Sequence, residues 1–150
     1  AAEELAREVY RRAVAARLFR GPCGVRLGGA WPEDRRVPRR SGEALGRQPA
    51  LRFRLPEVFQ SPILLLRLLE SLEEAFVGAY LGALPLLEGE ALRLAGAILG
   101  VEAGHRVLVR QARLELQDPL LRPPFVANDR ALEQALSPEG AREALKPYLP

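Results

Sequence analysis

Several residue types that build functional sites are scarce or missing in this chain. Cysteine occurs once, as Cys23, histidine occurs once, as His105, and methionine and threonine do not occur at all. A lone cysteine excludes an intrachain disulfide and a thiolate metal cluster within one chain. Because no histidine lies near it in the sequence, we expect Cys23 to be a loop or buried thiol and not a nucleophile.

Long apolar runs are missing as well. A membrane-spanning helix needs roughly eighteen or more consecutive apolar residues, and charged residues interrupt the most apolar stretch at positions 67, 70, 73 and 74. We therefore expect a soluble protein with no membrane partner. The chain begins without methionine and inside a helical pattern, from which we expect that an upstream segment was removed, either a signal peptide or more of the first helix. The sequence leaves open whether the protein stays in the cytoplasm or is exported.

Lysine occurs once, so that arginine supplies 21 of the 22 basic residues. Asparagine also occurs only once. A scarcity of thermolabile asparagine, methionine and cysteine is compatible with a thermophilic source. Nine arginines and three acidic residues fall between Arg20 and Arg54, which gives this segment a charge of about +6. Such a segment can bind nucleic acid through its phosphates, but its only large aromatics are Trp31 and Phe53 and it has no recognised motif. We expect a solvated loop and no nucleic-acid partner.

The remaining composition is that of a globular protein, and the length suits a single domain. An Ala-, Glu-, Leu- and Arg-rich pattern predicts a first helix over residues 1–19, ended by Gly21 and Pro22. From there to about Pro56, glycine and proline recur so often that at most one or two helical turns fit, around residues 43–45. A connection this long without regular structure is uncommon inside a compact domain.

A helical hairpin occupies the centre of the sequence. Ser61 and Pro62 form a helix start, since serine caps free amides and proline at the first position has no amide to leave unsatisfied. This helix covers about residues 62–83, where Leu84-Pro85 breaks it. The next helix starts near residue 88 or 90 and covers about 88–117. So short a junction forces the two helices to lie antiparallel.

Two short helices are expected after the loop at 118–127. One is capped by Asn128 or Asp129, and the other is started by Ser137 and Pro138. No segment alternates with period two for long enough to predict a strand. The fold class is therefore all-α.

Both helices of the hairpin carry an apolar stripe with helical spacing, which predicts the face that each one buries. The stripe residues are Leu65, Leu69, Leu72, Phe76, Ala79 and Ala83 on the first helix, and Leu94, Ile98, Val101, Leu108 and Val109 on the second.

Three polar residues lie on or beside these stripes. Glu73 lies at the edge of the first, whereas Glu74 is turned by about 100° and should face solvent. Glu102 and His105 lie on the second stripe. A buried carboxylate is costly unless it is paired or bound to metal, and Glu-x-x-His presents an oxygen and a nitrogen donor from successive turns to a single point. His105 is thus either a metal ligand or a core histidine bonded to Glu102, Glu73 or Tyr80.

The run LLESLEEAFVGAYLGALPLLEGEALRLAGAILGVEAGHRVLVR, residues 68–110, resembles the second half of the ferritin-like domain family, which is related to desiccation-associated and rubrerythrin-like proteins. Its VGAYLGALPLL turn and its GVEAGH motif carry the resemblance. The resemblance implies that Glu73 is a bridging carboxylate from the third helix of the family's bundle. It also implies that the fourth helix supplies Glu102 and His105.

The first half of the chain repeats this pattern in part. Glu3 precedes Tyr10 by seven residues, as Glu73 precedes Tyr80, so Glu3 is the candidate ligand from the first helix. We expect the two tyrosines to be packing residues. The family's second helix should carry another Glu-x-x-His, but residues 21–42 contain no histidine.

Three explanations of this gap are open. The protein has lost one metal position and kept a mononuclear or incomplete site, or it has lost metal binding altogether, or the stretch 20–42 is an out-of-frame reading of a GC-rich gene. In each case a long irregular segment replaces much of helix two. The resemblance is best over residues 43–116, and residues 117–150 add short C-terminal helices.

The sequence therefore predicts one ferritin-like antiparallel helical bundle over residues 1–150, binding iron or manganese. Its expected ligands are Glu3, Glu73, Glu102 and His105. A complete di-metal site would draw about six protein ligands, so oxidase or peroxidase activity would be an extension, as would a role in oxidative stress or desiccation. The alternative is a metal-free helical scaffold with the same fold. Either form should be a homo-oligomer, since a bundle without one helix leaves apolar surface on the others.

Overall fold

The computed structural model describes residues 2–15, 54–55 and 57–149, and within the first of these ranges it describes the side chains of residues 4, 5 and 8–13. The α-helices are α1 (Ala2–Ala15), α4 (Pro62–Ala83), α5 (Gly89–Glu115) and α6 (Pro138–Leu145), and the 3-10 turns are η2 (Val58–Gln60) and η3 (Leu84–Leu86). The described ranges contain no strand. The all-α prediction is confirmed, whereas the irregular segment predicted from about residue 21 to about Pro56 lies almost entirely outside these ranges.

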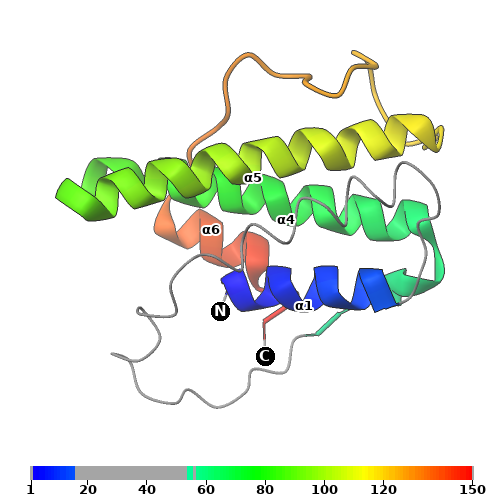
Figure 1. The fold of residues 1–150 in the computed structure, drawn as a ribbon, viewed down its shortest axis with the longest axis horizontal. Coiled ribbons are helices and arrows are strands. Elements are labelled where there is room, and N and C mark those ends of the chain that lie inside the picture. The colour runs from blue at the N-terminus through cyan, green and yellow to red at the C-terminus, as the bar shows by residue number, and fades with distance from the viewer. Residues whose placement is uncertain (1, 16–53, 56, 150) are drawn as a thin grey trace.

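The hairpin of α4 and α5 has the predicted bounds, because local signals fix both ends of each helix. The Ser61 hydroxyl accepts a hydrogen bond from the amide of Leu64, and Pro62 is the first helical residue. After the η3 turn, Gly89 begins α5 with a φ of +55°, a left-handed conformation that favours glycine. Figure 1 shows α4 and α5 lying side by side along most of their length.

Helix α4 is the centre of the molecule. It packs against α5 on one side and against α1 and α6 on another (Figure 1). Its aliphatic residues join Leu5, Val9, Tyr10 and Ala13 of α1 in one hydrophobic core. Four members of its predicted stripe are buried as expected, namely Leu65, Leu69, Leu72 and Phe76. A helix that is apolar around so much of its circumference is stable only when other elements cover it.

The stripe predicted on α5 is only partly right. Val109 is fully buried and Leu108 is half-buried, but Leu94 and Val101 are 52% and 51% exposed. The face that packs on α4 carries small and charged residues: Ala95, Glu102, His105, Arg106, Val109, Arg110 and Ala112. The spacing of apolar residues alone predicted part of the buried face of this helix wrongly. Charged side chains are buried there because they pair with residues of other elements, which the spacing does not reveal.

The short helix predicted to start at Asn128 or Asp129 does not form, since residues 118–137 contain no helix. Asp129 instead accepts a hydrogen bond from the buried guanidinium of Arg106. The segment then passes so close to α4 that a Cβ on Gly82 would lie 1.9 Å from the carbonyl oxygen of Leu136. The second expected helix is confirmed as α6, whose Ser137 hydroxyl accepts from the amide of Gly140 at 3.1 Å.

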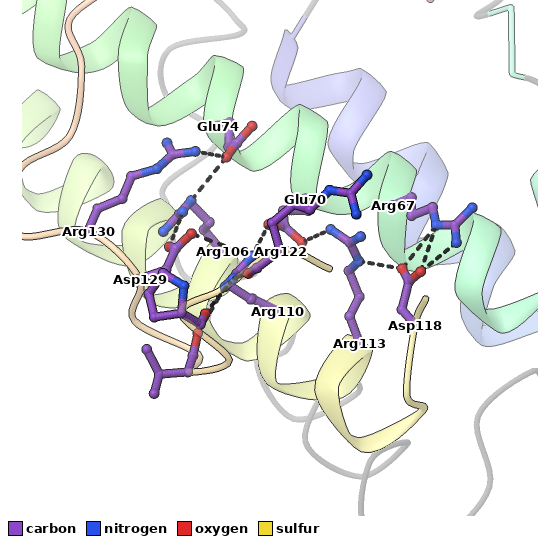
Figure 2. Close-up of polar contacts among 12 residues, drawn as sticks. Arg67, Glu70, Glu74, Arg106, Arg110, Arg113, Asp118, Arg122, Asp129 and Arg130 are labelled. Atoms are coloured by element: carbon purple, nitrogen blue, oxygen red, sulfur yellow. Dashed lines mark hydrogen bonds and ion pairs between the residues drawn. The ribbon is translucent and has the colours of Figure 1, made fainter. Parts of the chain in front are cut away.

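Alternating arginine and carboxylate side chains fix the segment 118–133 to α4 and α5. We call this set the arginine–carboxylate network, and Figure 2 shows ion pairs running from one labelled side chain to the next. Its members are Arg67, Glu70, Glu74, Arg106, Arg110, Arg113, Asp118, Asp129, Arg130 and Glu133.

The most buried member of the network is Arg106, whose side chain is fully buried and pairs with Asp129, Glu133 and Glu74. Arg110 adds hydrogen bonds to three backbone carbonyls of the loop, those of residues 122, 124 and 126. Burying such groups costs several kcal/mol unless every partner is in place. The buried arginines therefore need the acceptor groups of the loop, and the same ion pairs and hydrogen bonds hold the loop in position.

Asp118 anchors the start of this loop. The Arg67 guanidinium, which donates to both of its oxygens, holds the pKa of Asp118 well below its usual range, and the Leu120 amide and Arg113 act in the same direction. Burial opposes this shift. The ionised carboxylate is thus strongly favoured in the folded protein.

We predict that Asp118→Asn lowers the free energy of unfolding at pH 7 by roughly 2 kcal/mol, because hydrogen bonds to a charged group are lost. The folded-state pKa of Asp118 is depressed. Its contribution to stability is therefore fully present above the unfolded pKa of about 3.9, and it is lost as pH falls from there through the folded-state pKa. Urea unfolding from pH 7 to pH 2 should show the difference between wild type and variant shrinking below about pH 5. The exposed Glu57→Gln is the control, and a difference that stays constant with pH would contradict this assignment.

Candidate metal centre

Two carboxylates and one imidazole converge between α4 and α5. Each of Glu73, Glu102 and His105 offers a ligand atom, and these three atoms lie within 4.8 Å of one another. Glu73 comes from the middle of α4, and the other two come from successive turns of α5. Their exposed fractions are only 1%, 9% and 9%. The antiparallel packing of the hairpin brings together three of the four ligands expected from the sequence.

Hydrogen bonds order this cluster. The Nδ1 atom of His105 lies 3.2 Å from Oε2 of Glu102 and 3.9 Å from Oε1 of Glu73. These are two of the three partners that the core-histidine reading offered. The Tyr10 hydroxyl donates to Oε1 of Glu73 at 2.6 Å, and the ring centroids of Tyr10 and His105 are 6.1 Å apart. Helix α1 thus contributes to the same centre.

Glu102 has a lowered pKa in spite of its burial. Burial is the largest single influence and raises the pKa, but hydrogen bonds with His105 and with Glu73, together with the charge of His105, outweigh it. The lowered pKa favours the ionised form of Glu102, which is the form that can bind a cation.

Tyr10 has a role that the sequence did not reveal. It was expected to be a packing residue, and it is buried, but its hydroxyl also fixes the orientation of Glu73. A signal was present, because Tyr10 lies among Leu5, Val9 and Ala13 on the apolar face of α1. A hydroxyl on such a face usually has a hydrogen-bond partner when it is buried.

Two other expectations have different outcomes. The side chain of Glu3 lies outside the described part of α1, so its role as a ligand stays a prediction. Glu74 was expected to face solvent, and 37% of its side chain is exposed. It also pairs with Arg130 and Arg106, so it belongs to the arginine–carboxylate network and not to the cluster.

Comparison with known proteins agrees with this architecture. Residues 38–115 match the family model of a ferritin-like domain, which is just over half of the chain and includes α4, α5 and the three clustered residues. The chain therefore belongs to the ferritin-like domain family. A search of curated proteins gives no match, and neither does a search of solved structures. Among the described residues, no helix is long and apolar enough to cross a membrane.

We predict that Tyr10→Phe lowers the free energy of unfolding by roughly 1–2 kcal/mol, because the buried carboxylate of Glu73 loses a hydrogen-bond donor. Chemical denaturation of the metal-free protein would measure it. Tyr148→Phe removes a hydroxyl from a half-buried tyrosine at the other end of the chain and is the matched control. Equal effects of the two substitutions would show that the bond to Glu73 has no special weight.

Proposed function

We propose that this ferritin-like protein binds an iron or manganese ion between α4 and α5 through Glu73, Glu102 and His105, with Glu3 as a further ligand. The observation that carries the proposal is the convergence of these three buried side chains on one point. A role in protection against oxidative stress or desiccation is proposed from the resemblance of residues 68–110 to the family.

The donor set fits such an ion. Ligand atoms around one first-row divalent ion lie at most roughly 4.3 Å apart, since each bond is about 2.0–2.2 Å long. The atoms of the cluster lie within 4.8 Å of one another, so closing on an ion needs side-chain movements of a few tenths of an ångström. Carboxylate oxygens suit hard ions such as manganese, and imidazole is compatible with iron.

The burial of the cluster also supports a cation. Two carboxyl groups inside a hydrophobic core are costly to bury, and a bound cation would offset that cost. Carboxylate and imidazole ligands must be deprotonated to bind a metal ion, so we expect affinity to rise with pH. The hydroxyl of Tyr10 would keep Glu73 turned toward the centre while the aliphatic residues of α4 exclude water.

A bound iron or manganese ion would supply one-electron chemistry at this centre. The chain's own contribution is three described ligands, which is half of the about six that a complete di-metal site takes. We therefore propose a site for a single ion. No nucleic-acid partner is part of the proposal.

The test is equilibrium loading with Mn²⁺ and, without oxygen, with Fe²⁺, followed by metal analysis of the desalted protein. We expect about one ion per wild-type chain, and Glu73→Gln, Glu102→Gln and His105→Gln should each weaken binding at least tenfold. The ion should also raise the midpoint of thermal unfolding, since a ligand at 100 times its dissociation constant stabilises by about 2.7 kcal/mol.

Glu74→Gln is the matched control, because Glu74 is the next carboxylate on α4 but pairs with arginines. It should keep full metal binding. Loading of wild type and Glu102→Gln to the same extent would contradict the site. No binding by wild type would favour the metal-free scaffold instead.

A further inference from the structure

One buried residue of α5 outside the metal cluster is the neighbour of a proposed ligand. Arg106 directly follows His105, and its exposed fraction is 0%. The guanidinium donates hydrogen bonds to Asp129 and Glu133, which lie 23 and 27 residues further along the chain. Figure 2 shows it between Asp129 and Glu74, and Glu74 adds a longer ion pair, 3.5 Å from Nε. Both of these hydrogen bonds therefore come from the segment after α5, and neither comes from Glu74.

Few other contacts fix the turn of α5 that carries the ligands. From residue 96 to residue 108, the buried side chains of α5 are those of its two proposed ligands and of Arg106. The apolar side chains of this stretch are at most half-buried. Gly100 and Gly104 lie on either side of Glu102, and glycine has a low helix propensity. Apolar packing, which supplies most of the stability of helices in proteins, is therefore weaker here than along α4.

The burial of Arg106 connects its partners to the position of the helix. A guanidinium stays charged at every accessible pH, and a buried charge without partners is strongly unfavourable. If Asp129 and Glu133 moved away, the side chain of Arg106 would have to reach water. From a fully buried position, this requires that α5 turn or move away from α4 at this level. His105 would move as well, because it is the preceding residue on the same helix.

We propose that residues 129–133, which we call the anchoring segment, hold the ligand-bearing turn of α5 in place through Arg106 and so determine how tightly the metal ion binds. This inference rests on the proposed metal site and adds positioning residues that do not touch the ion. Loss of groups that orient metal ligands typically weakens metal binding about 10–100-fold. Here the effect passes through the backbone of α5, and Asp129→Asn should weaken Mn²⁺ binding at least tenfold.

Asp118 offers a matched control in the same loop. It pairs with Arg67 and Arg113, and Arg113 lies in the last turn of α5, away from the ligands. Asp118→Asn is the same isosteric change as Asp129→Asn, and it should also lower the stability of the protein. If general stability determined metal affinity, the two substitutions would act alike. If the position of the ligand-bearing turn determines it, only the change at residue 129 weakens binding.

The first measurement is the dissociation constant for Mn²⁺, obtained by chelator competition on untagged proteins. We expect Asp129→Asn to bind at least tenfold more weakly than wild type, and Asp118→Asn to stay within about twofold. Glu133→Gln, at a side chain that is 24% exposed, is the milder second variant in case Asp129→Asn does not fold, and it should weaken binding about fivefold. Equal binding by wild type and the variants of the anchoring segment would overturn the proposal. Equal weakening by Asp118→Asn would overturn it as well.

The second measurement needs no metal. His105 is the only histidine of the chain, so its ring ¹⁵N NMR signals need no further assignment, and its Nδ1 lies 3.2 Å from Oε2 of Glu102. At one fixed pH, Asp129→Asn should shift these signals in the metal-free protein, whereas Asp118→Asn should leave them at their wild-type values. Unshifted signals in Asp129→Asn would overturn the proposal, whether or not wild type binds Mn²⁺. Shifted signals together with no Mn²⁺ binding by wild type would contradict the proposed metal site but support the positioning of His105 by the anchoring segment.

Discussion

The pairing of buried charges between α4 and α5 is the constraint on which the rest of the molecule depends. Helix α4 is buried around most of its circumference, yet it carries Glu70 and Glu73 inside. An unpaired carboxylate in that position would cost several kcal/mol. Each therefore has a specific set of partners. Glu73 meets Tyr10, Glu102 and His105, and Glu70 meets arginines of α5. Loss of either set would destabilise the hairpin, because a buried carboxylate would be left without its partners.

These two sets lie one helical turn apart and have different compositions. Around Glu73 the partners are the hydroxyl of Tyr10, the carboxyl group of Glu102 and the imidazole of His105. Around Glu70 the partners are guanidinium groups, which stay charged at every accessible pH. The carboxylates on that side are already paired with arginines. These ion pairs also hold the segment 118–133, which contains no helix, against α4 and α5. The same interface thus contains one centre at which we propose a bound cation and one in which arginines already pair with the carboxylates.

Sequence reasoning identified the hairpin because its signals are local. Capping at Ser61, the break at Leu84-Pro85 and the spacing of Glu102 and His105 each act within a few residues, and the short turn between the helices then brings Glu73 opposite. The inner face of α5 and the segment after residue 118 were misjudged because they depend on ion pairs between residues far apart in the sequence, such as Arg106 with Asp129. Tyr10 was underestimated for the same reason, since its partner is 63 residues away.

The central claim is that Glu73, Glu102 and His105 surround a single metal ion, and anomalous diffraction tests it most directly. Crystals grown with Mn²⁺ and measured near the manganese absorption edge would locate the ion. The claim predicts one strong anomalous peak between α4 and α5, about 2.0–2.3 Å from an oxygen of each glutamate and from a nitrogen of the histidine. A map with no peak there, or with manganese bound only at surface carboxylates, would contradict it.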